Sequence, residues 1–327
     1  MKVFESISDL EGIGHGWAVA IGNFDGVHRG HQEILRRTGV AAHAAHAIGV
    51  AAITFDPHPM ALLHPDRAPG ILTPLPYRIG LLEQYGVDCL IILRDGLRVF
   101  NMSPKDFVDD LLVRRLGPRV IVEGGDFHFG YGRSGTVQTL REMGETRGFS
   151  VVVVDPFVIR DAEGRPSVCS SSHIRDLLDE GAVRTAGEIL GRPYRLMGRT
   201  VPGRGIGTQL GFPTANIHAL EQIVPAEGVY AGFAIISETM DALLAPTQRM
   251  PAVFSIGRAK TFVTDHPLLL EAHILDRTLG DLHGKWLAMD FVDCLRGQQR
   301  FESRDALAAQ IAADCGKARR ILGESDR

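Results

Sequence analysis

Short apolar runs alternate with longer mixed segments through the first half of the chain. Continuous apolar runs predict strands at residues 17–21, 49–55, 87–93, 120–123 and 151–154. The segments between them have helical spacing and predict helices at residues 30–45, 77–85, 104–116 and 137–146. This alternation predicts a parallel sheet with helices on both faces. Ligands of such sheets bind outside the carboxyl ends of the strands.

The pattern changes near residue 191. Two further helices are predicted at residues 170–178 and 182–190, and the second ends at Gly191. Strand-like runs with turn residues between them then follow at residues 229–236, 252–256, 268–275 and 286–291. They predict a small antiparallel barrel. The last segment is helical, with one face formed by Leu307, Ile311, Cys315, Ala318 and Leu322.

Length and composition agree with two globular domains, which we expect at residues 1–190 and 191–327. The formal charge of -4 gives no basic excess, so a general nucleic-acid binder is disfavoured. Four scattered cysteines form no CxxC pair, which argues against zinc or disulfides and fits the cytoplasm. No apolar run approaches the roughly 20 residues of a membrane helix, and no secretory signal is recognisable.

The first chemical motif follows the first strand and opens the first helix. Residues 22–31 read Gly-Asn-Phe-Asp-Gly-Val-His-Arg-Gly-His. A helix N-terminus offers free N–H groups to phosphate, and Gly26 and Gly30 allow a close backbone approach. His28 and His31 are three residues apart, so both imidazoles can face one phosphate and stabilise the charge that develops on it.

This motif resembles the signature of the nucleotidyltransferase superfamily. In its longer form, residues 21–32, it is similar to the N-terminal module of bacterial bifunctional riboflavin kinase/FAD synthetases. Further segments match that family in order: Thr-Phe-Asp-Pro-His-Pro at 54–59, Gly-Asp-Phe-His-Phe-Gly at 125–130 and Ser-Ser-Ser-His-Ile-Arg at 170–175. The resemblance implies a Rossmann-like nucleotidyltransferase domain followed by a riboflavin kinase-like barrel.

By this resemblance, His28 and His31 are catalytic. The residues expected to bind ATP and its phosphates are Gly22, Asn23, Phe24, Asp25, Gly30, Ser171, Ser172 and Arg175. The residues expected to bind flavin in this module are Asp126, Phe127 and Phe129. Purely structural roles remain as alternatives at three places. The serines can be helix caps, residues 56–58 can form a rigid turn, and the two phenylalanines can be core residues.

The second motif covers residues 203–217 and lacks the Lys-Ser or Lys-Thr of a Walker A loop. Its Phe-Pro-Thr-Ala-Asn string, residues 212–216, resembles the riboflavin kinase module. The resemblance implies that Thr214 and Asn216 hold Mg²⁺, as oxygen ligands suit a hard cation. It also implies that Glu271 accepts the proton of the riboflavin 5′-hydroxyl. The remaining implied contacts are Gly203, Gly207 and Gly211 with phosphate and Arg296 with flavin.

Departures from the family pattern gather in the second module. The family usually has Asn, Pro, Tyr and an acid where this chain has Ser255, Lys260, His283 and Gln298, and a basic residue where it has Thr208. His173, in the first module, is a milder change. Together these departures make kinase activity less secure than adenylyl transfer.

We therefore expect phosphorylation of riboflavin by ATP in the second module and transfer of an adenylyl group from ATP to FMN in the first. ATP, riboflavin, FMN and Mg²⁺ are the implied small molecules, without nucleic-acid or membrane partners. One alternative is an FMN adenylyltransferase with a degenerate kinase-like domain. Another is a flavin-responsive binding protein without turnover. Oligomeric state is left open, with a weak homo-oligomer among the alternatives.

Overall fold

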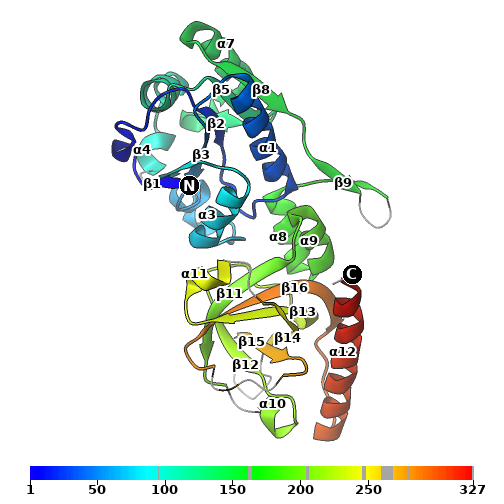
Figure 1. Cartoon of the computed structure of the whole chain (residues 1–327). Coiled ribbons are helices and arrows are strands. Elements are labelled where there is room, and N and C mark those ends of the chain that lie inside the picture. Colours follow the sequence, from blue (N-terminus) through cyan, green and yellow to red (C-terminus); the bar gives the residue numbers. More distant parts are fainter. Residues whose placement is uncertain are drawn as a thin grey trace. The chain divides into compact units, whose positions relative to one another are not determined.

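The computed structural model divides the chain into two compact units, and each is described by itself (Figure 1). The first holds Met1–Pro69 and Leu75–Cys169, and the second holds Gly70–Pro74 and Ser170–Arg327. The residues that the structure describes are 1–94, 96–160, 164–203, 206–244, 248–258, 268–277, 280 and 282–325. These units are defined by the contacts between residues and not by activity. The functional boundary expected at residue 190 therefore stays a prediction.

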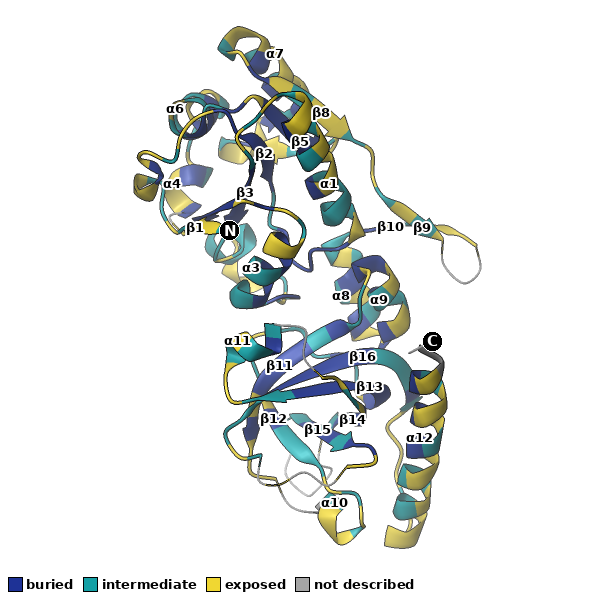
Figure 2. Ribbon diagram, viewed as in Figure 1, coloured by how far each residue is buried: buried dark blue, intermediate teal, exposed yellow. Residues whose placement is uncertain are grey.

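A six-stranded parallel sheet forms the centre of the first unit, in the order β1-β4-β3-β2-β5-β8. Its strands are β1 (Lys2–Phe4), β2 (Ala18–Ile21), β3 (Val50–Phe55), β4 (Cys89–Leu93), β5 (Val120–Gly124) and β8 (Ser150–Val154). The parallel sheet predicted from the apolar runs is confirmed, and β1 is an additional edge strand. The central strands are buried, whereas β8 at the other edge is largely exposed (Figure 2).

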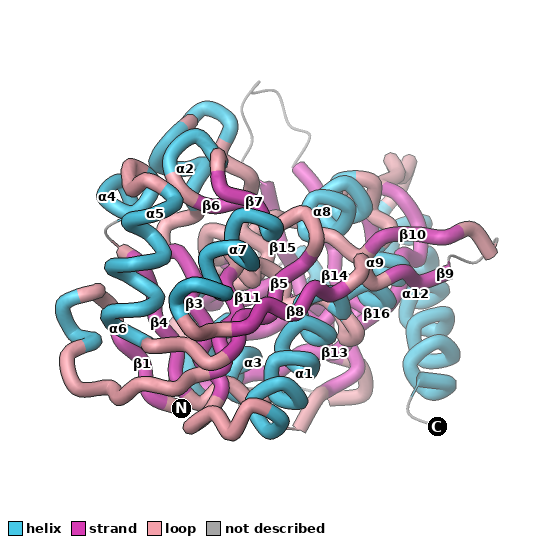
Figure 3. Tube along the Cα trace, turned by 90° about the horizontal axis from the view of Figure 1, so that it is seen from above, coloured by secondary structure: helices cyan, strands magenta, loops and turns pink. Residues whose placement is uncertain are grey.

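Helices cover both faces of this sheet, as predicted (Figure 3). One face carries α1 (Arg29–Ala44) and α3 (Leu75–Gln84). The other face carries α4 (Gly96–Phe100), α5 (Pro104–Asp106), the π-helical segment η3 (Phe107–Val113), α6 (Arg114–Leu116) and α7 (Val137–Arg147). The helix predicted at residues 104–116 is thus present, with a π-helical middle. Phe107, Leu111 and Leu140 pack with the strands in the core of this face.

A closed barrel forms the second unit, in the order β11-β12-β15-β14-β13-β16, and all its neighbouring strands are antiparallel. Its strands are β11 (Tyr194–Val201), β12 (Ala215–Ala219), β13 (Gly228–Ser237), β14 (Met250–Arg258), β15 (Leu268–Ile274) and β16 (Trp286–Gly297). The final helix α12 (Arg304–Ser325) packs Cys315, Ala318 and Leu322 against the barrel. The predicted barrel and its terminal helix are confirmed.

The helices α8 (Ser171–Asp179) and α9 (Val183–Leu190) belong to the barrel unit. So does the short segment Gly70–Pro74, which hydrogen bonds fix there. Ile223 N donates to Ile71 O at 2.9 Å, and Gln222 Nε2 donates to Leu72 O at 3.2 Å. Arg175 on α8 donates from Nε to Gly70 O at 2.7 Å.

Smaller elements complete the two units. In the first unit they are η1 (Ser8–Leu10), α2 (Pro59–Leu63), η2 (Pro65–Arg67), β6 (His128–Phe129), η4 (Tyr131–Arg133), β7 (Gly135–Thr136), β9 (Val158–Arg160) and β10 (Pro166–Val168). In the second unit they are α10 (Ile206–Gln209) and α11 (Met240–Leu244).

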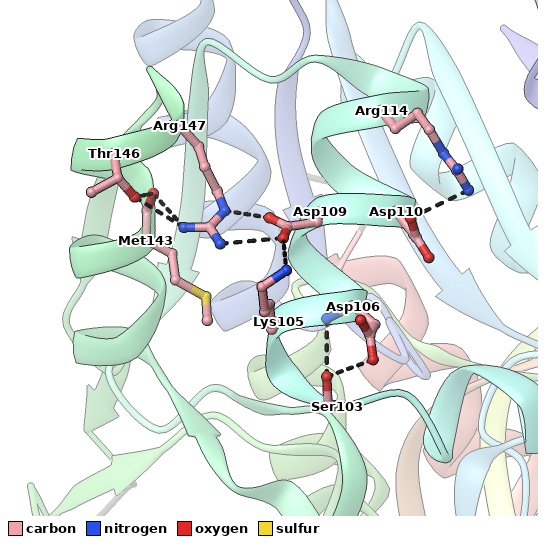
Figure 4. A network of polar contacts seen from close by, with 9 residues as sticks. All are labelled: Ser103, Lys105, Asp106, Asp109, Asp110, Arg114, Met143, Thr146 and Arg147. Atoms are coloured by element: carbon pink, nitrogen blue, oxygen red, sulfur yellow. Dashed lines mark hydrogen bonds and ion pairs between the residues drawn. The ribbon is translucent and has the colours of Figure 1, made fainter.

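A polar network ties the π-helical segment to its surroundings (Figure 4). Arg147 on α7 donates to both carboxylate oxygens of Asp109, and Lys105 donates to Asp109 Oδ2 at 2.8 Å. These hydrogen bonds lower the pKa of Asp109 to about 2. Asp110 lies one residue further on and pairs with the exposed Arg114, at 3.3 Å.

We expect Asp109→Asn to lower the free energy of unfolding of the first unit at pH 7 by about 1 kcal/mol, since it weakens two partly exposed ion pairs. Because the folded-state pKa is depressed, this stability is present above the unfolded value of 3.8 and is lost as the pH falls towards 2. Urea unfolding at several pH values measures the effect. The matched control Asp110→Asn should change stability by under about 0.5 kcal/mol.

Candidate active sites

The first predicted site is built on the loop between β2 and α1. Gly26, Phe24 and Val27 all have positive φ, at 86°, 48° and 39°, so the backbone turns sharply before the helix. His28 is the N-cap of α1, and its Nδ1 accepts a hydrogen bond from His31 N at 3.3 Å. The two imidazoles stack with their ring centres 3.7 Å apart. The structure therefore brings both predicted catalytic histidines together at a helix N-terminus, where anions bind favourably.

Gly30 makes room for this arrangement. A Cβ at Gly30 would lie 3.0 Å from His28 Cε1 and 3.2 Å from the carbonyl oxygen of Cys169. Both approaches are tighter than ordinary van der Waals contact. A side chain at position 30 would thus crowd the His28 ring and the Cys169 carbonyl, and these neighbours would have to shift.

A buried arginine on α3 holds the loop, and sequence analysis missed it. The side chain of Arg78 is 7% exposed, and its Nη1 donates to Asn23 O at 3.1 Å. Its Nη2 lies 3.9 Å from Asp25 Oδ1, and that carboxylate is 4% exposed. Thr54 Oγ1 also donates to Asn23 O, at 3.0 Å. Asp25 therefore contacts Arg78 on the inner side of the loop, and its contact with ATP stays a prediction.

The turn after β3 contributes a third histidine. His58 caps α2, as its Nδ1 accepts a hydrogen bond from Met60 N at 3.1 Å. Its Nε2 lies 3.0 Å from Asn23 Nδ2. The peptide bond between Asp56 and Pro57 is cis. His58 thus contacts Asn23 of the first loop.

A cavity of about 650 Å³ opens beside this loop. Gly22, Asn23, Phe24 and His31 line one part of it, and residues 126–133 line another. Its aromatic and histidine-rich walls suit a flat ring system carrying phosphates.

The three predicted flavin contacts of this module differ in exposure. Asp126, Phe127 and Phe129 all line the cavity. Phe129 is only 5% exposed and packs in the core, whereas Phe127 is partly buried. The two rings stack with their centres 5.7 Å apart. Phe129 thus serves the core and the cavity wall together.

Sequence analysis also missed Glu123, which is 2% exposed and lines the same cavity. It stands at the end of an apolar strand, and the strand pattern gave no signal for a buried acid there.

The serines of the third motif lie in the second unit. Ser170 is the N-cap of α8, since its Oγ accepts a hydrogen bond from His173 N at 3.2 Å. Ser171 and Ser172 form the first turn. The capping role is thus carried by the residue before the two that were predicted to bind ATP. The roles of Ser171, Ser172 and Arg175 with ATP stay predictions.

The second site lies across three barrel strands. On β15, Glu271 is directly opposite Asn216 of β12 on one side and Ser255 of β14 on the other. Directly paired residues of antiparallel strands place their side chains on the same face. The sheet register therefore brings together the predicted catalytic acid and one predicted metal ligand, which are far apart in the sequence.

Glycines make room for both predicted metal ligands. A Cβ at Gly203 would lie 1.9 Å from Asn216 Nδ2, and a Cβ at Gly207 would lie 3.2 Å from Thr214 Oγ1. At Gly211 the requirement is the backbone itself, with a φ of 84°. The glycine-rich segment thus resembles a phosphate loop in composition, but Gly203 leaves room for the Asn216 side chain, and Gly207 leaves room chiefly for the carbonyl oxygen of Phe212.

A cavity of about 430 Å³ adjoins these residues and is lined by Gly203, Thr214, Asn216, Arg277 and His283, among others. His273 Nδ1 lies 2.8 Å from Pro213 O, in the segment that carries Thr214 and leads into β12. Among the described residues, no group of three or more His, Cys, Asp or Glu side chains could hold a metal ion. A hydroxyl and an amide oxygen beside a cavity fit a hard cation that keeps waters and substrate phosphates as further ligands.

Two departures from the family pattern touch each other. Gln298 Nε2 lies 3.3 Å from Ser255 Oγ and donates to Ile256 O at 2.8 Å. A Cβ at Gly257 would lie 2.8 Å from that Nε2, so the glycine admits the amide. The altered positions thus form a local contact next to the strand of Glu271. Lys260 lies outside the described residues.

Arg296 has close partners within the barrel unit. Its Nε and Nη2 donate to the carboxylate of Asp314 on α12, with Nη2 at 2.8 Å from Oδ2. The two side chains are 14% and 6% exposed. This ion pair anchors α12 to the barrel, and a contact of Arg296 with flavin stays a prediction.

Comparison with known proteins identifies both parts of the chain. A model of the FAD synthetase family matches residues 11–170, and a model of the riboflavin kinase family matches residues 190–322. A bifunctional riboflavin kinase/FMN adenylyltransferase of Escherichia coli is 34% identical over 99% of this chain and 98% of its own length. One from Pseudomonas fluorescens is 35% identical over 99% of both chains. The chain belongs to this family.

A solved structure shares the fold over almost the whole chain. It is named as a macrolide-efflux protein from Streptococcus pneumoniae, and it covers 97% of this chain and 98% of its own with a TM-score of 0.83 and 27% identity. Within the described part of the present chain, no helix has the length and apolar character needed to cross a membrane. The family and fold expected from the sequence are confirmed.

Because Gly30 leaves space for the His28 ring, we expect Gly30→Ala to lower kcat/KM for adenylyl transfer at least about tenfold, as small misplacements of reacting groups are costly. Riboflavin phosphorylation by the same chain should be unchanged. Gly39→Ala on the same helix is the matched control, since its Cβ meets nothing within 4 Å. That variant should keep both activities. Equal activity of the two variants would contradict the role given to Gly30.

Proposed function

We propose that the chain carries out two successive phosphate reactions at separate sites. The barrel unit phosphorylates riboflavin with ATP to give FMN. The site at the N-terminus of α1 then transfers the adenylyl group of a second ATP to FMN, which gives FAD and pyrophosphate. The observation that carries the second assignment is the stacked pair His28 and His31 at a helix N-terminus beside a cavity of about 650 Å³.

In adenylyl transfer, an oxygen of the FMN phosphate attacks the α-phosphorus of ATP, and the bond from that phosphorus to pyrophosphate breaks. No covalent enzyme intermediate is needed. His28 accepts a backbone N–H at Nδ1, so its neutral ring carries the proton at Nε2 and can donate it to a phosphate oxygen. The amide groups at the start of α1 add positive potential where negative charge develops. Arg175 is assigned to the departing pyrophosphate.

In riboflavin phosphorylation, Glu271 accepts the proton of the 5′-hydroxyl as that oxygen attacks the γ-phosphorus of ATP. Glu271 is paired with Asn216 of β12, which we assign to the metal ion, and this pairing supports the role of the carboxylate. The absence of side chains at Gly203 and Gly207 leaves room for the side chains of Asn216 and Thr214.

A divalent cation, which we assign as Mg²⁺, would be held in the barrel site by Thr214 and Asn216 together with phosphate oxygens. When bound, it offsets the charge of the triphosphate. We also propose a cytoplasmic location and small-molecule substrates without a nucleic-acid partner, in line with the absence of a basic excess in the sequence.

Two observations weaken the alternative that the kinase module is degenerate. The two altered residues Ser255 and Gln298 are within 3.3 Å of each other, and Glu271, Thr214 and Asn216 are all retained. The riboflavin kinase model matches across the whole barrel, residues 190–322.

Separate sites predict crossed effects of two substitutions. His28→Ala should reduce FAD formation at least about a hundredfold, because it removes a donor to the transition state, and should leave FMN formation intact. Glu271→Ala should abolish FMN formation by removal of the general base and leave adenylyl transfer to supplied FMN intact. Chromatography of reactions with riboflavin and ATP, then with FMN and ATP, measures both. Parallel loss of the two activities in either variant would argue against separate sites.

The contact between Gln298 and Ser255 gives a second test. Gln298→Ala removes donors to Ser255 Oγ and Ile256 O and should lower kcat/KM for riboflavin about fivefold, since one hydrogen bond contributes about 1 kcal/mol. Ser255→Ala should add little to that loss in the double variant, because the two residues share one contact. Additive losses in the double variant would show that they act independently. Adenylyl transfer by the same samples is the internal control.

A further inference from the structure

The strands β2 and β5 are neighbours at the point where the order of the strands in the sheet reverses. From β2 the chain continues to β3 and β4 on one side, and it returns to β5 on the other. Such a switch point is where open α/β sheets bind their ligands. The two strands are paired at Ala18 with Val120 and at Val19 with Ile121. Beyond these pairs, the backbone of β2 requires another partner on this side.

Glu123 supplies that partner. Its Oε1 accepts a hydrogen bond from Ile21 N at 2.6 Å, across a gap of 102 residues in the sequence. The main-chain N–H at the end of β2 is thus satisfied by a side chain of β5. The next residue along the chain is Gly22, where the loop of the adenylyl transfer site begins.

The side chain is both buried and adjacent to the cavity. Glu123 is 2% exposed, yet it lines the cavity of about 650 Å³ together with Asn23 and His31. Burial raises its pKa well above the usual value, the hydrogen bond from Ile21 opposes this, and the charge of Asp126 adds to the rise. Burial of this kind favours the neutral form of the carboxyl, which carries a proton that it can donate.

The surroundings favour the neutral form for a second reason. Two phosphorylated substrates meet in this cavity if the proposed function holds, and a carboxylate there would repel them. The strands on either side, β2 and β8, carry no titratable side chain. The titratable or cationic residues that line the cavity are His31 from α1, His58 and His64 from the α2 segment, and Asp126, His128, Tyr131 and Arg133 from the segment after β5.

We propose that Glu123, as an uncharged acid, is a positioning residue of adenylyl transfer: it holds the ends of β2 and β5 together through Ile21 and donates a hydrogen bond to the substrate bound at this switch point. The acceptor is an oxygen or ring nitrogen of ATP or FMN. This inference rests on the proposed function, because it takes those molecules as the occupants of the cavity. The residue exchanges no proton during the reaction.

Two substitutions separate this role from simple packing, and both are made in the full chain. Glu123→Gln keeps the shape, an oxygen for Ile21 N–H and a donor for the substrate, so kcat/KM for FAD formation at pH 7 should stay within about threefold. Glu123→Met keeps the volume without either hydrogen bond, and it should lose at least about tenfold. Riboflavin phosphorylation by the same samples reports whether the chain is folded and should be unchanged in both variants.

Infrared difference spectroscopy reads the protonation state directly. The spectrum of the wild type minus that of Glu123→Gln should show the carbonyl band of a protonated carboxylic acid at pH 7. Addition of FMN alone or of ATP alone should shift this band, and the ligand that shifts it is the acceptor. Absence of the band, no shift with either ligand, or full adenylyl transfer by Glu123→Met would overturn the proposal. If the wild type makes no FAD from FMN and ATP, the proposed function itself fails, which is a distinguishable result.

Discussion

Both candidate sites depend on steric room beside a functional side chain. A Cβ at Gly30 would crowd the His28 ring at 3.0 Å, and the amide of Asn216 occupies the space that a Cβ at Gly203 would fill. Each functional group is therefore held by packing against backbone, which has less freedom than a side chain. Two unrelated architectures, a parallel sheet and a closed barrel, use the same device. Positioning of this kind suits phosphate transfer, where orientation and charge supply most of the rate.

The first site also depends on buried charge. Arg78 and Asp25 are almost fully buried, and Arg78 reaches the main chain of Asn23 and of Phe55. A buried ion pair costs desolvation energy, and removal of one partner leaves the other uncompensated. Its value here is structural specificity, because the loop before α1 has three residues with positive φ, Phe24, Gly26 and Val27, and needs fixed partners on its inner side.

Periodicity was sufficient to predict the parallel sheet, the barrel and the buried face of α12, because each repeats over several residues. It failed where a polar residue interrupts the run. Strand β11 contains Arg195, which pairs with Asp290 of β16 at 2.6 Å inside the unit. Charged residues such as Arg78 and Glu123 are expected at the surface. Their burial could not be predicted because it depends on segments that are distant in the sequence. The strand register that pairs Glu271 with Asn216 likewise could not be predicted from the local pattern of hydrophobic and polar residues.

The segment Gly70–Pro74 has a consequence for dissecting the molecule. It lies in the middle of the first family match, but its hydrogen-bond partners Arg175, Gln222 and Ile223 belong to the barrel unit. A barrel expressed from residue 191 onward would lack this segment, so the N–H of Ile223 and the amide of Gln222 would have to be satisfied by water. The boundaries of the family matches and the boundaries of the compact units therefore differ in this chain. Genetic separation of the two activities would change the thermodynamics of the barrel as well as its connectivity.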